Sequence, residues 1–120
     1  MVEAKQKIWL ERNGKLVFGH GRKLLLEAIE ECGSINAAAK KLRMSYRAAW
    51  GKLRTTEQRL GIALVQIKTP GGSAHLTDAA RELIDKFDTL NTETETFLKN
   101  RCRRLSFPLS PKKERKCGSK

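Results

Sequence analysis

Residues 33–61 read GSINAAAKKLRMSYRAAWGKLRTTEQRLG, and this stretch contains the signals of two helices joined by a very short break. Ser34 and Ser45 are each placed as an N-cap, because a serine hydroxyl accepts a hydrogen bond from the free N–H groups at the start of a helix. Arg43-Met44 is the break between them, and the closing glycine ends the second helix. The pattern predicts a helix-turn-helix at residues 34–60.

Apolar residues recur at helical spacing in this stretch and in the segment before it, from about Arg22 to Cys32. We therefore expect three helices that share one core. The inner faces are predicted to be Leu25, Ala28, Ile29 and Cys32 in the first helix, Ile35, Ala38 and Leu42 in the second, and Ala49, Leu53, Thr56 and Leu60 in the third.

Two short hairpins flank these helices. Residues 6–19 alternate apolar and polar side chains around Asn13-Gly14, a pair that favours a two-residue hairpin turn because both positions adopt positive φ. The register that we predict pairs Leu10 with Val17 and Trp9 with Phe18. Residues 63–76 form the second hairpin, a wing with a turn-rich tip. The fold class is thus mainly α with small β hairpins, a winged helix-turn-helix.

A long helix is expected from the Thr77 cap to about residue 104. Its apolar positions step by three and four residues, as in a heptad repeat, over about three heptads. We interpret this seam as a dimerisation surface; the alternative is that it packs on the domain of its own chain. The seam comprises Ala80, Leu83, Phe87, Leu90, Thr94 and Phe97.

Charge is segregated along the chain, whose formal net charge is +12. Residues 40–59 contain seven Lys or Arg and a single Glu, whereas residues 78–98 contain six acidic residues and two basic ones. This division predicts one face turned toward a polyanion and another turned away from it. Residues 105–120 form a basic tail with two prolines, whose composition is typical of a disordered segment. This tail either contacts phosphates or is only a solvated terminus.

The residues that we expect to contact double-stranded DNA lie on the helix-turn-helix and the wing. A recognition helix presents polar and basic side chains from its first turns to base edges, and neighbouring cations reach phosphates. Ser45 can cap its helix whether or not it contacts DNA. Trp50 is interpreted as a packing residue rather than a base-stacking one. For the wing, contact with a DNA groove and a plain hairpin turn are both open interpretations. The candidates are Ser34, Lys40, Arg43, Ser45, Tyr46, Arg47, Lys52, Arg54, Lys68 and Thr69.

Several function classes lack support in the sequence. Three cysteines without ligand spacing, and two histidines, indicate neither a disulfide framework nor a metal site, and no cofactor is expected. There is no nucleophile with a base or phosphate-binding glycine loop, so we do not predict an enzyme. No apolar run is long enough to span a bilayer or serve as a signal peptide, so no membrane partner and a cytoplasmic location are expected.

Residues 33–72, GSINAAAKKLRMSYRAAWGKLRTTEQRLGIALVQIKTPGG, together with the later AHLTDAARELI, resemble the N-terminal DNA-binding domain of ModE, the molybdate-responsive family of bacterial regulators. They are related more distantly to the LysR-type winged helix. The resemblance covers roughly residues 19–100, and SYRAAW at 45–50 is its most specific part. It implies a homodimer joined through the long helix, with the helix from Ser45 in the major groove and Trp50 in family-typical packing.

The resemblance does not extend to the oxyanion-binding domains of full-length members, so no oxyanion ligand is expected on this chain. We expect a DNA-binding domain at 1–76, a dimerisation helix at 77–104 and the tail at 105–120. The predicted function is that of a homodimeric, sequence-specific transcription regulator. The resemblance to ModE, by analogy only, points to molybdenum-related genes as its targets. The alternatives are a winged-helix adaptor for protein partners and a non-specific, nucleoid-type DNA binder.

Overall fold

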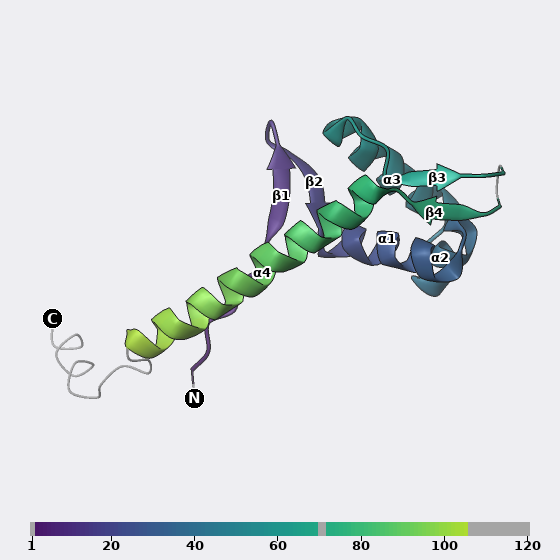
Figure 1. Ribbon diagram of the computed structural model, residues 1–120. Coiled ribbons are helices and arrows are strands. Elements are labelled where there is room, and N and C mark those ends of the chain that lie inside the picture. Colours follow the sequence, from purple (N-terminus) through teal and green to yellow (C-terminus); the bar gives the residue numbers. More distant parts are fainter. Residues whose placement is uncertain (1, 70–71, 106–120) are drawn as a thin grey trace, which may run out of the picture. The chain divides into compact units, whose positions relative to one another are not determined.

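The computed structural model describes residues 2–69 and 72–105, which form two compact units. The first unit is Ile8–Asp88, and the described part of the second comprises residues 2–7 and 89–105. The chain is mostly helical with two small antiparallel sheets, as the sequence predicts (Figure 1). Its elements, in order, are β1 (Trp9–Arg12), β2 (Lys15–Gly19), α1 (His20–Cys32), α2 (Ile35–Lys41), α3 (Tyr46–Leu60), β3 (Val65–Ile67), β4 (Ala74–Leu76) and α4 (Asp78–Arg104).

The predicted register of the first hairpin is wrong beyond the turn. Asn13 and Gly14 take positive φ, and Arg12 pairs with Lys15 as a two-residue turn requires. The register then shifts, so that Leu10 lies opposite Phe18 rather than Val17, and Trp9 lies opposite Gly19 rather than Phe18. The cause is an extra residue in β2, a bulge that allows the consecutive side chains of Val17 and Phe18 both to be buried.

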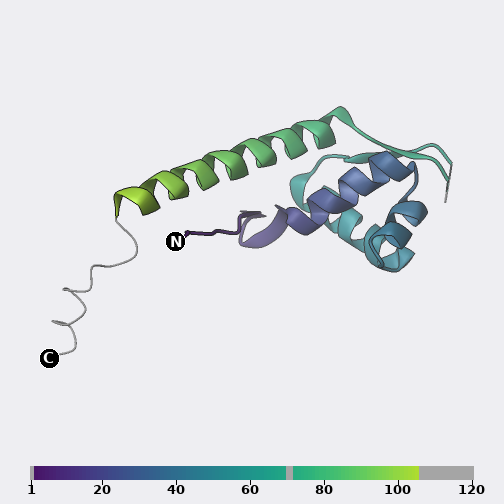
Figure 2. The same cartoon turned by 90° about the horizontal axis from the view of Figure 1, so that it is seen from below.

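α2 and α3 begin at the expected serine caps and α3 ends at the expected glycine, whereas α1 begins at His20, two residues before its expected start. The Ser34 hydroxyl accepts a hydrogen bond from the Ala37 N–H, and the Ser45 hydroxyl accepts one from the Ala48 N–H, both at 3.0 Å. Gly33 follows α1 with a φ of +81°, in the left-handed region that only glycine adopts without strain. Figure 2 shows these helices gathered beside the β3–β4 hairpin.

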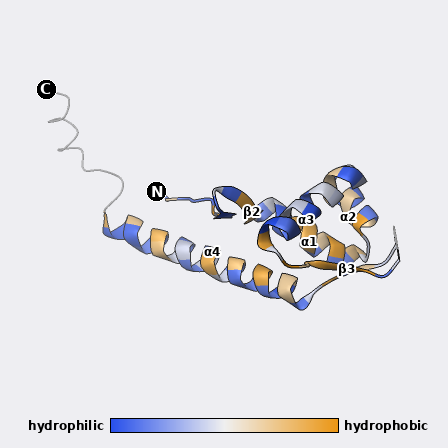
Figure 3. Ribbon diagram, turned by 90° about the horizontal axis from the view of Figure 1, so that it is seen from above, coloured by the Kyte–Doolittle hydropathy of each residue, from blue (hydrophilic) through white to orange (hydrophobic). Residues whose placement is uncertain are grey.

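The core of the Ile8–Asp88 unit is mostly aliphatic. Phe18 from β2 and Phe87 from α4 are its aromatic members, and their rings meet edge to face at 5.2 Å. Figure 3 shows apolar bands that recur along α4. The other buried hydrophobic residues on the helices of this unit are Leu25, Leu26, Ala28, Ile29, Ile35, Ala38, Ala39, Ala49, Leu53, Ala80 and Ile84.

In the second unit, the N-terminal segment is bonded to α4. The Gln6 side-chain amide donates to the Asn91 side chain at 3.1 Å, and the Cys102 thiol donates to the Val2 carbonyl at 3.7 Å. The predicted tail, beyond Leu105, lies outside the described residues. Within residues 2–69 and 72–105, no helix is both long and apolar enough to span a membrane.

Candidate nucleic-acid interface

The turn between α2 and α3 sets the direction of α3. Leu42 caps α2, and the N–H of Met44 donates to the Ala39 carbonyl at 3.0 Å. Arg43 has a φ of +60°, which is the left-handed region and is strained for any residue with a Cβ. The strained residue allows a connection of only a few residues, so that Ser45 caps α3 immediately afterwards.

α3 has one buried and one open face. Ala49, Leu53 and Thr56 are buried, as predicted, whereas Leu60 is only half-buried. Because an α-helix places residues three and four apart on one side, the open face is equally regular. It consists of the exposed residues Arg47, Gly51, Arg54 and Gln58.

Three side chains of α3, each four residues from the next, are stacked. The rings of Tyr46 and Trp50 lie nearly parallel, at an angle of 9° with centroids 6.5 Å apart. The guanidinium carbon of Arg54 lies 5.6 Å from the centre of the Trp50 ring, within range of a cation–π interaction. Trp50 is half-buried against the core, in agreement with its predicted packing role, and Tyr46 is 42% exposed.

The cations around α3 are largely free of acidic partners. Lys41 is paired with Glu31. The only acid in residues 40–59, Glu57, is engaged elsewhere: its carboxylate accepts from the N–H groups of Leu64 at 2.7 Å and Val65 at 3.2 Å. Within residues 40–59, five exposed cations lie within 4 Å of no carboxylate of the described residues: Lys40, Arg43, Arg47, Lys52 and Arg54. A surface of this charge attracts a polyanion.

Two arginines from other elements bond to α3, one on its buried side and one at its C-terminal end. The Arg22 guanidinium of α1 donates to the Thr56 hydroxyl at 2.8 Å. Burial, together with the nearby charge of Arg59, lowers the pKa of Arg22 from its ordinary value. Arg12 of β1 donates to the Leu60 carbonyl at 3.0 Å, which satisfies a free carbonyl at the negative end of the helix dipole.

The wing is anchored next to the helices through β4 and closed by a bond between its own two sides. The N–H of Ala74 donates to the Gly33 carbonyl at 2.8 Å, and the N–H of Lys68 donates to the Ser73 carbonyl at 3.0 Å. Lys68 and Thr69, the two wing candidates, are exposed. The tip at residues 70–71 lies outside the described residues.

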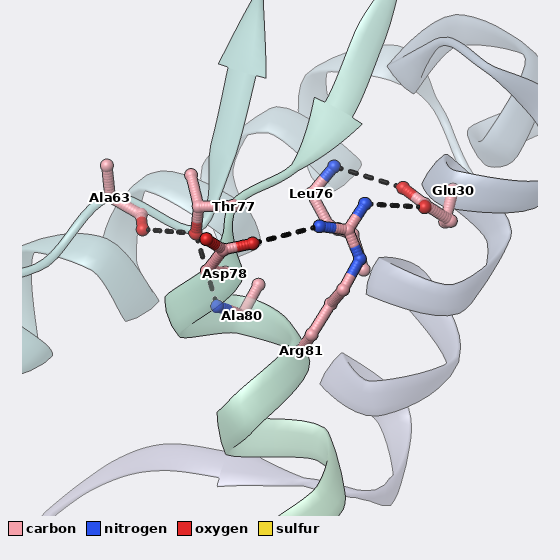
Figure 4. A network of polar contacts seen from close by, with 7 residues as sticks. All are labelled: Glu30, Ala63, Leu76, Thr77, Asp78, Ala80 and Arg81. Carbon is pink, nitrogen blue, oxygen red and sulfur yellow. Dashed lines mark hydrogen bonds and ion pairs between the residues drawn. The ribbon is translucent and has the colours of Figure 1, made fainter.

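A polar network holds the wing's base and the start of α4 together (Figure 4). Glu30 accepts from the Leu76 N–H at 3.1 Å and from Arg81 at 2.8 Å. The bond from Arg81 and the backbone N–H lower the pKa of the Glu30 carboxyl below its ordinary value. Thr77 caps α4: its hydroxyl accepts from the Ala80 N–H at 3.1 Å and donates to the Ala63 carbonyl at 2.8 Å.

The ten predicted DNA-contact residues are not equivalent in the structure. Ser34 is half-buried and its hydroxyl is used as an N-cap. Ser45 is exposed, although its hydroxyl also caps a helix. The other eight are exposed: Lys40, Arg43, Tyr46, Arg47, Lys52, Arg54, Lys68 and Thr69.

The predicted seam of α4 is divided by burial. Ala80 and Phe87 are buried within the Ile8–Asp88 unit, and Leu83 is half-buried. In the second unit, Leu90 is 43% exposed and Phe97 is 61% exposed, with a half-buried Thr94 between them. Phe87 needs no cover from a second chain, because Phe18 covers it. The apolar surface that remains open is the later part of the seam.

Sequence reasoning missed Gly51, Arg22 and Glu30 as contributors to this surface. Gly51 lies at the centre of the open face of α3, and a Cβ added there meets nothing within 4 Å. The signal for it was present, because glycine in the middle of a helix is unfavourable and therefore informative. Arg22 and Glu30 gave no local signal, since their partners lie more than thirty residues away.

The comparisons with known proteins agree with this geometry. Residues 24–81 match the model of the bacterial regulatory helix-turn-helix proteins of the LysR family. The DNA-binding domain of CbnR, solved in complex with DNA, superposes with a TM-score of 0.52, covering 71% of this chain and 94% of that one at 24% identity. The fold is thus that of a winged helix-turn-helix domain of the LysR type.

Within that class, the helix-turn-helix is similar to that of the ModE regulators, as the sequence resemblance predicts. The chain is 38% identical over 85 residues to the molybdenum transport protein ModE of Azotobacter vinelandii, an alignment that covers 68% of this chain and 32% of the relative. It is 36% identical over 74 residues to the transcriptional regulator ModE of Haemophilus influenzae, covering 59% and 29%. The chain therefore spans about a third of the length of these relatives.

Proposed function

We propose that this chain binds double-stranded DNA as a transcription regulator, with α3 in the major groove. The observation that carries the proposal is the open face of α3 and its surroundings, where five exposed cations have no carboxylate within 4 Å in the described residues. Glu57, the one acid in residues 40–59, is bonded to the wing backbone, and Glu31 is paired with Lys41. Such an arrangement keeps positive charge available for phosphates.

The candidate DNA-contact residues fall into two groups according to their position, one assigned to base edges and one to phosphates. The first turn of α3 carries Ser45, Tyr46 and Arg47, which we assign to base edges because a recognition helix reads bases from its N-terminal residues. Arg and Lys side chains around this turn are assigned to phosphates, as are the two exposed wing residues and the α2 cap. These are Ser34, Lys40, Arg43, Lys52, Arg54, Lys68 and Thr69.

We further propose that two copies join through the later part of the α4 seam. Leu90 and Phe97 are large apolar side chains that remain exposed on one chain, and a partner helix buries them without altering the Ile8–Asp88 unit. Residues 1–76 then act as the DNA-binding part and residues 77–104 as the dimerisation helix. Two recognition helices in such a dimer meet half-sites roughly 34–36 Å apart.

The test is selection of genomic DNA fragments by the purified chain, followed by a gel shift with the recovered site and a scrambled competitor. The double variant Tyr46→Ala, Arg47→Ala is expected to lose at least about tenfold in affinity, since one good base contact contributes roughly 1–3 kcal/mol. Lys86→Ala is the control, because Lys86 is paired with Glu82 on α4.

Each outcome discriminates among functions. Equal affinity for the selected and the scrambled sites overturns sequence specificity and favours a non-specific, nucleoid-type binder. Undiminished affinity in the double variant overturns the role of α3, and absence of any DNA binding favours a winged-helix adaptor.

The relatives' names refer to molybdenum transport and regulation, so by analogy we propose that the selected fragments include molybdenum-related genes.

A further inference from the structure

We infer that Trp50 is a positioning residue, which holds the Arg54 guanidinium ready for a DNA phosphate through the stack Tyr46–Trp50–Arg54. The inference rests on the proposed function and assigns a mechanism to one of its contacts. Trp50 itself need not touch DNA: it acts through Arg54.

The stack is a consequence of helical spacing and of the core beneath it. Residues four apart lie on adjacent turns of the same side of α3, which brings the three side chains into line. Trp50 is half-buried against the core, so its ring is fixed by packing. Tyr46 stacks on the ring at 6.5 Å, and Arg54 lies 5.6 Å from the ring centre. The ring is therefore a rigid platform that restrains a long, flexible side chain.

The manner in which Arg54 is held leaves its hydrogen-bonding groups available. A carboxylate partner binds a guanidinium through its N–H groups, which all lie in the plane of the group. A ring partner instead attracts the face of the guanidinium. In residues 2–69 and 72–105, Arg54 makes no ion pair and no side-chain hydrogen bond. Its N–H groups thus stay open to a phosphate, which accepts two of them in parallel.

Preorganisation explains why such a stack favours binding. A free arginine loses rotamer freedom when it binds a phosphate, and this loss opposes association. Stacking on Trp50 removes part of that freedom before DNA arrives. The expected gain is about two- to fivefold in affinity, the size of a cation–π interaction at an exposed site.

The test is a double-mutant cycle on the full chain, with a short fluorescent DNA duplex of mixed sequence as the probe. Because phosphate contacts do not depend on sequence, this probe suffices. Trp50→Leu is expected to lower affinity about two- to fivefold when Arg54 is present, and to have little further effect in the Arg54→Ala background. Trp50→Phe, which keeps an aromatic ring, is expected to restore part of the loss.

Two further measurements separate positioning from a merely structural role. Arg54→Ala is expected to lower the slope of log affinity against log salt by about one, and Trp50→Leu to leave that slope nearly unchanged because the contact itself remains. In a Trp9→Phe background, Trp50 is the remaining tryptophan, and its emission is expected to change when Arg54 is replaced by Ala. Thermal unfolding of Trp50→Phe checks that the domain stays folded.

Additive losses from Trp50→Leu and Arg54→Ala overturn the inference while the proposed function stands. Equal affinity of Trp50→Leu and the unaltered chain overturns it as well. If the unaltered chain fails to bind any duplex, the proposed function falls, and this inference falls with it.

Discussion

Arg43 lies between α2 and α3 with a φ of +60°, a conformation that costs a residue with a Cβ roughly 1–2 kcal/mol. Glycine adopts it without strain. The side chain is exposed and, among the described residues, pairs with no acid. Strain that stability does not require points to a function for the side chain, here a phosphate contact.

We expect Arg43→Gly to raise the free energy of unfolding by up to about 1 kcal/mol, part of the relief being offset by glycine's greater freedom in the unfolded chain. The same variant is expected to bind DNA several-fold more weakly. Thermal or chemical unfolding and fluorescence anisotropy measure the two effects. An Arg43→Gly chain with unchanged DNA affinity contradicts the assigned contact.

Gly51 and Gly61 are two positions in and after α3 at which the same substitution to alanine is expected to have opposite effects on stability. Gly51 lies within α3, and an added Cβ there meets no atom within 4 Å. Gly51→Ala is therefore expected to stabilise the free chain by about 1 kcal/mol, the difference in helix propensity. The matched control is Gly61→Ala, which is expected to destabilise it because Gly61 has a φ of +73°. Unfolding curves that show both variants shifted in the same direction refute this account.

At the scale of elements, the wing and the start of α4 are held by Glu30. Its pKa is lowered by Arg81 and the Leu76 N–H. A carboxyl whose pKa is lower in the folded chain than in the unfolded chain stabilises the fold fully above its unfolded pKa, about 4.5. That stabilisation is lost as the pH falls through the lowered pKa of the folded chain. Glu30→Gln is therefore expected to be less stable at pH 7 and to show a flatter loss of stability in acid.

Denaturant unfolding at a series of pH values measures this effect. Glu82→Gln is the control, because Glu82 bonds only to the exposed Lys86 in the described part of the chain and holds no backbone N–H. A Glu30→Gln chain whose acid unfolding parallels that of the unaltered chain shows that the network does not contribute.

At the scale of the whole molecule, the exposed part of the α4 seam predicts self-association. Phe97→Asp is expected to raise the dimer dissociation constant by at least about tenfold, since burial of a phenylalanine side chain contributes roughly 1.5–3 kcal/mol. Sedimentation of both chains over a range of concentrations measures it. Thr96→Asp, the neighbouring exposed position, adds the same charge without removing apolar surface and is expected to stay dimeric. A monomeric unaltered chain contradicts the proposed dimer.

The sequence by itself determined the order and approximate bounds of the elements, because caps, turns and apolar spacing act over a few residues. Ser34, Ser45 and Asn13-Gly14 are local signals of this kind, and each acts as predicted. The exposed cations of α2 and α3 were also foreseeable, since helical spacing separates them from the buried positions.

Only the tertiary structure decided how distant parts of the chain meet. The bulge that buries Val17 and Phe18 shifts the hairpin register, because the core needs both side chains. Phe18 also covers Phe87, which separates a packed part of the α4 seam from an exposed one. The bonds of Arg22 to Thr56 and of Glu30 to Leu76 join residues far apart in sequence. Such contacts depend on the packing of complete elements, and no local pattern encodes them.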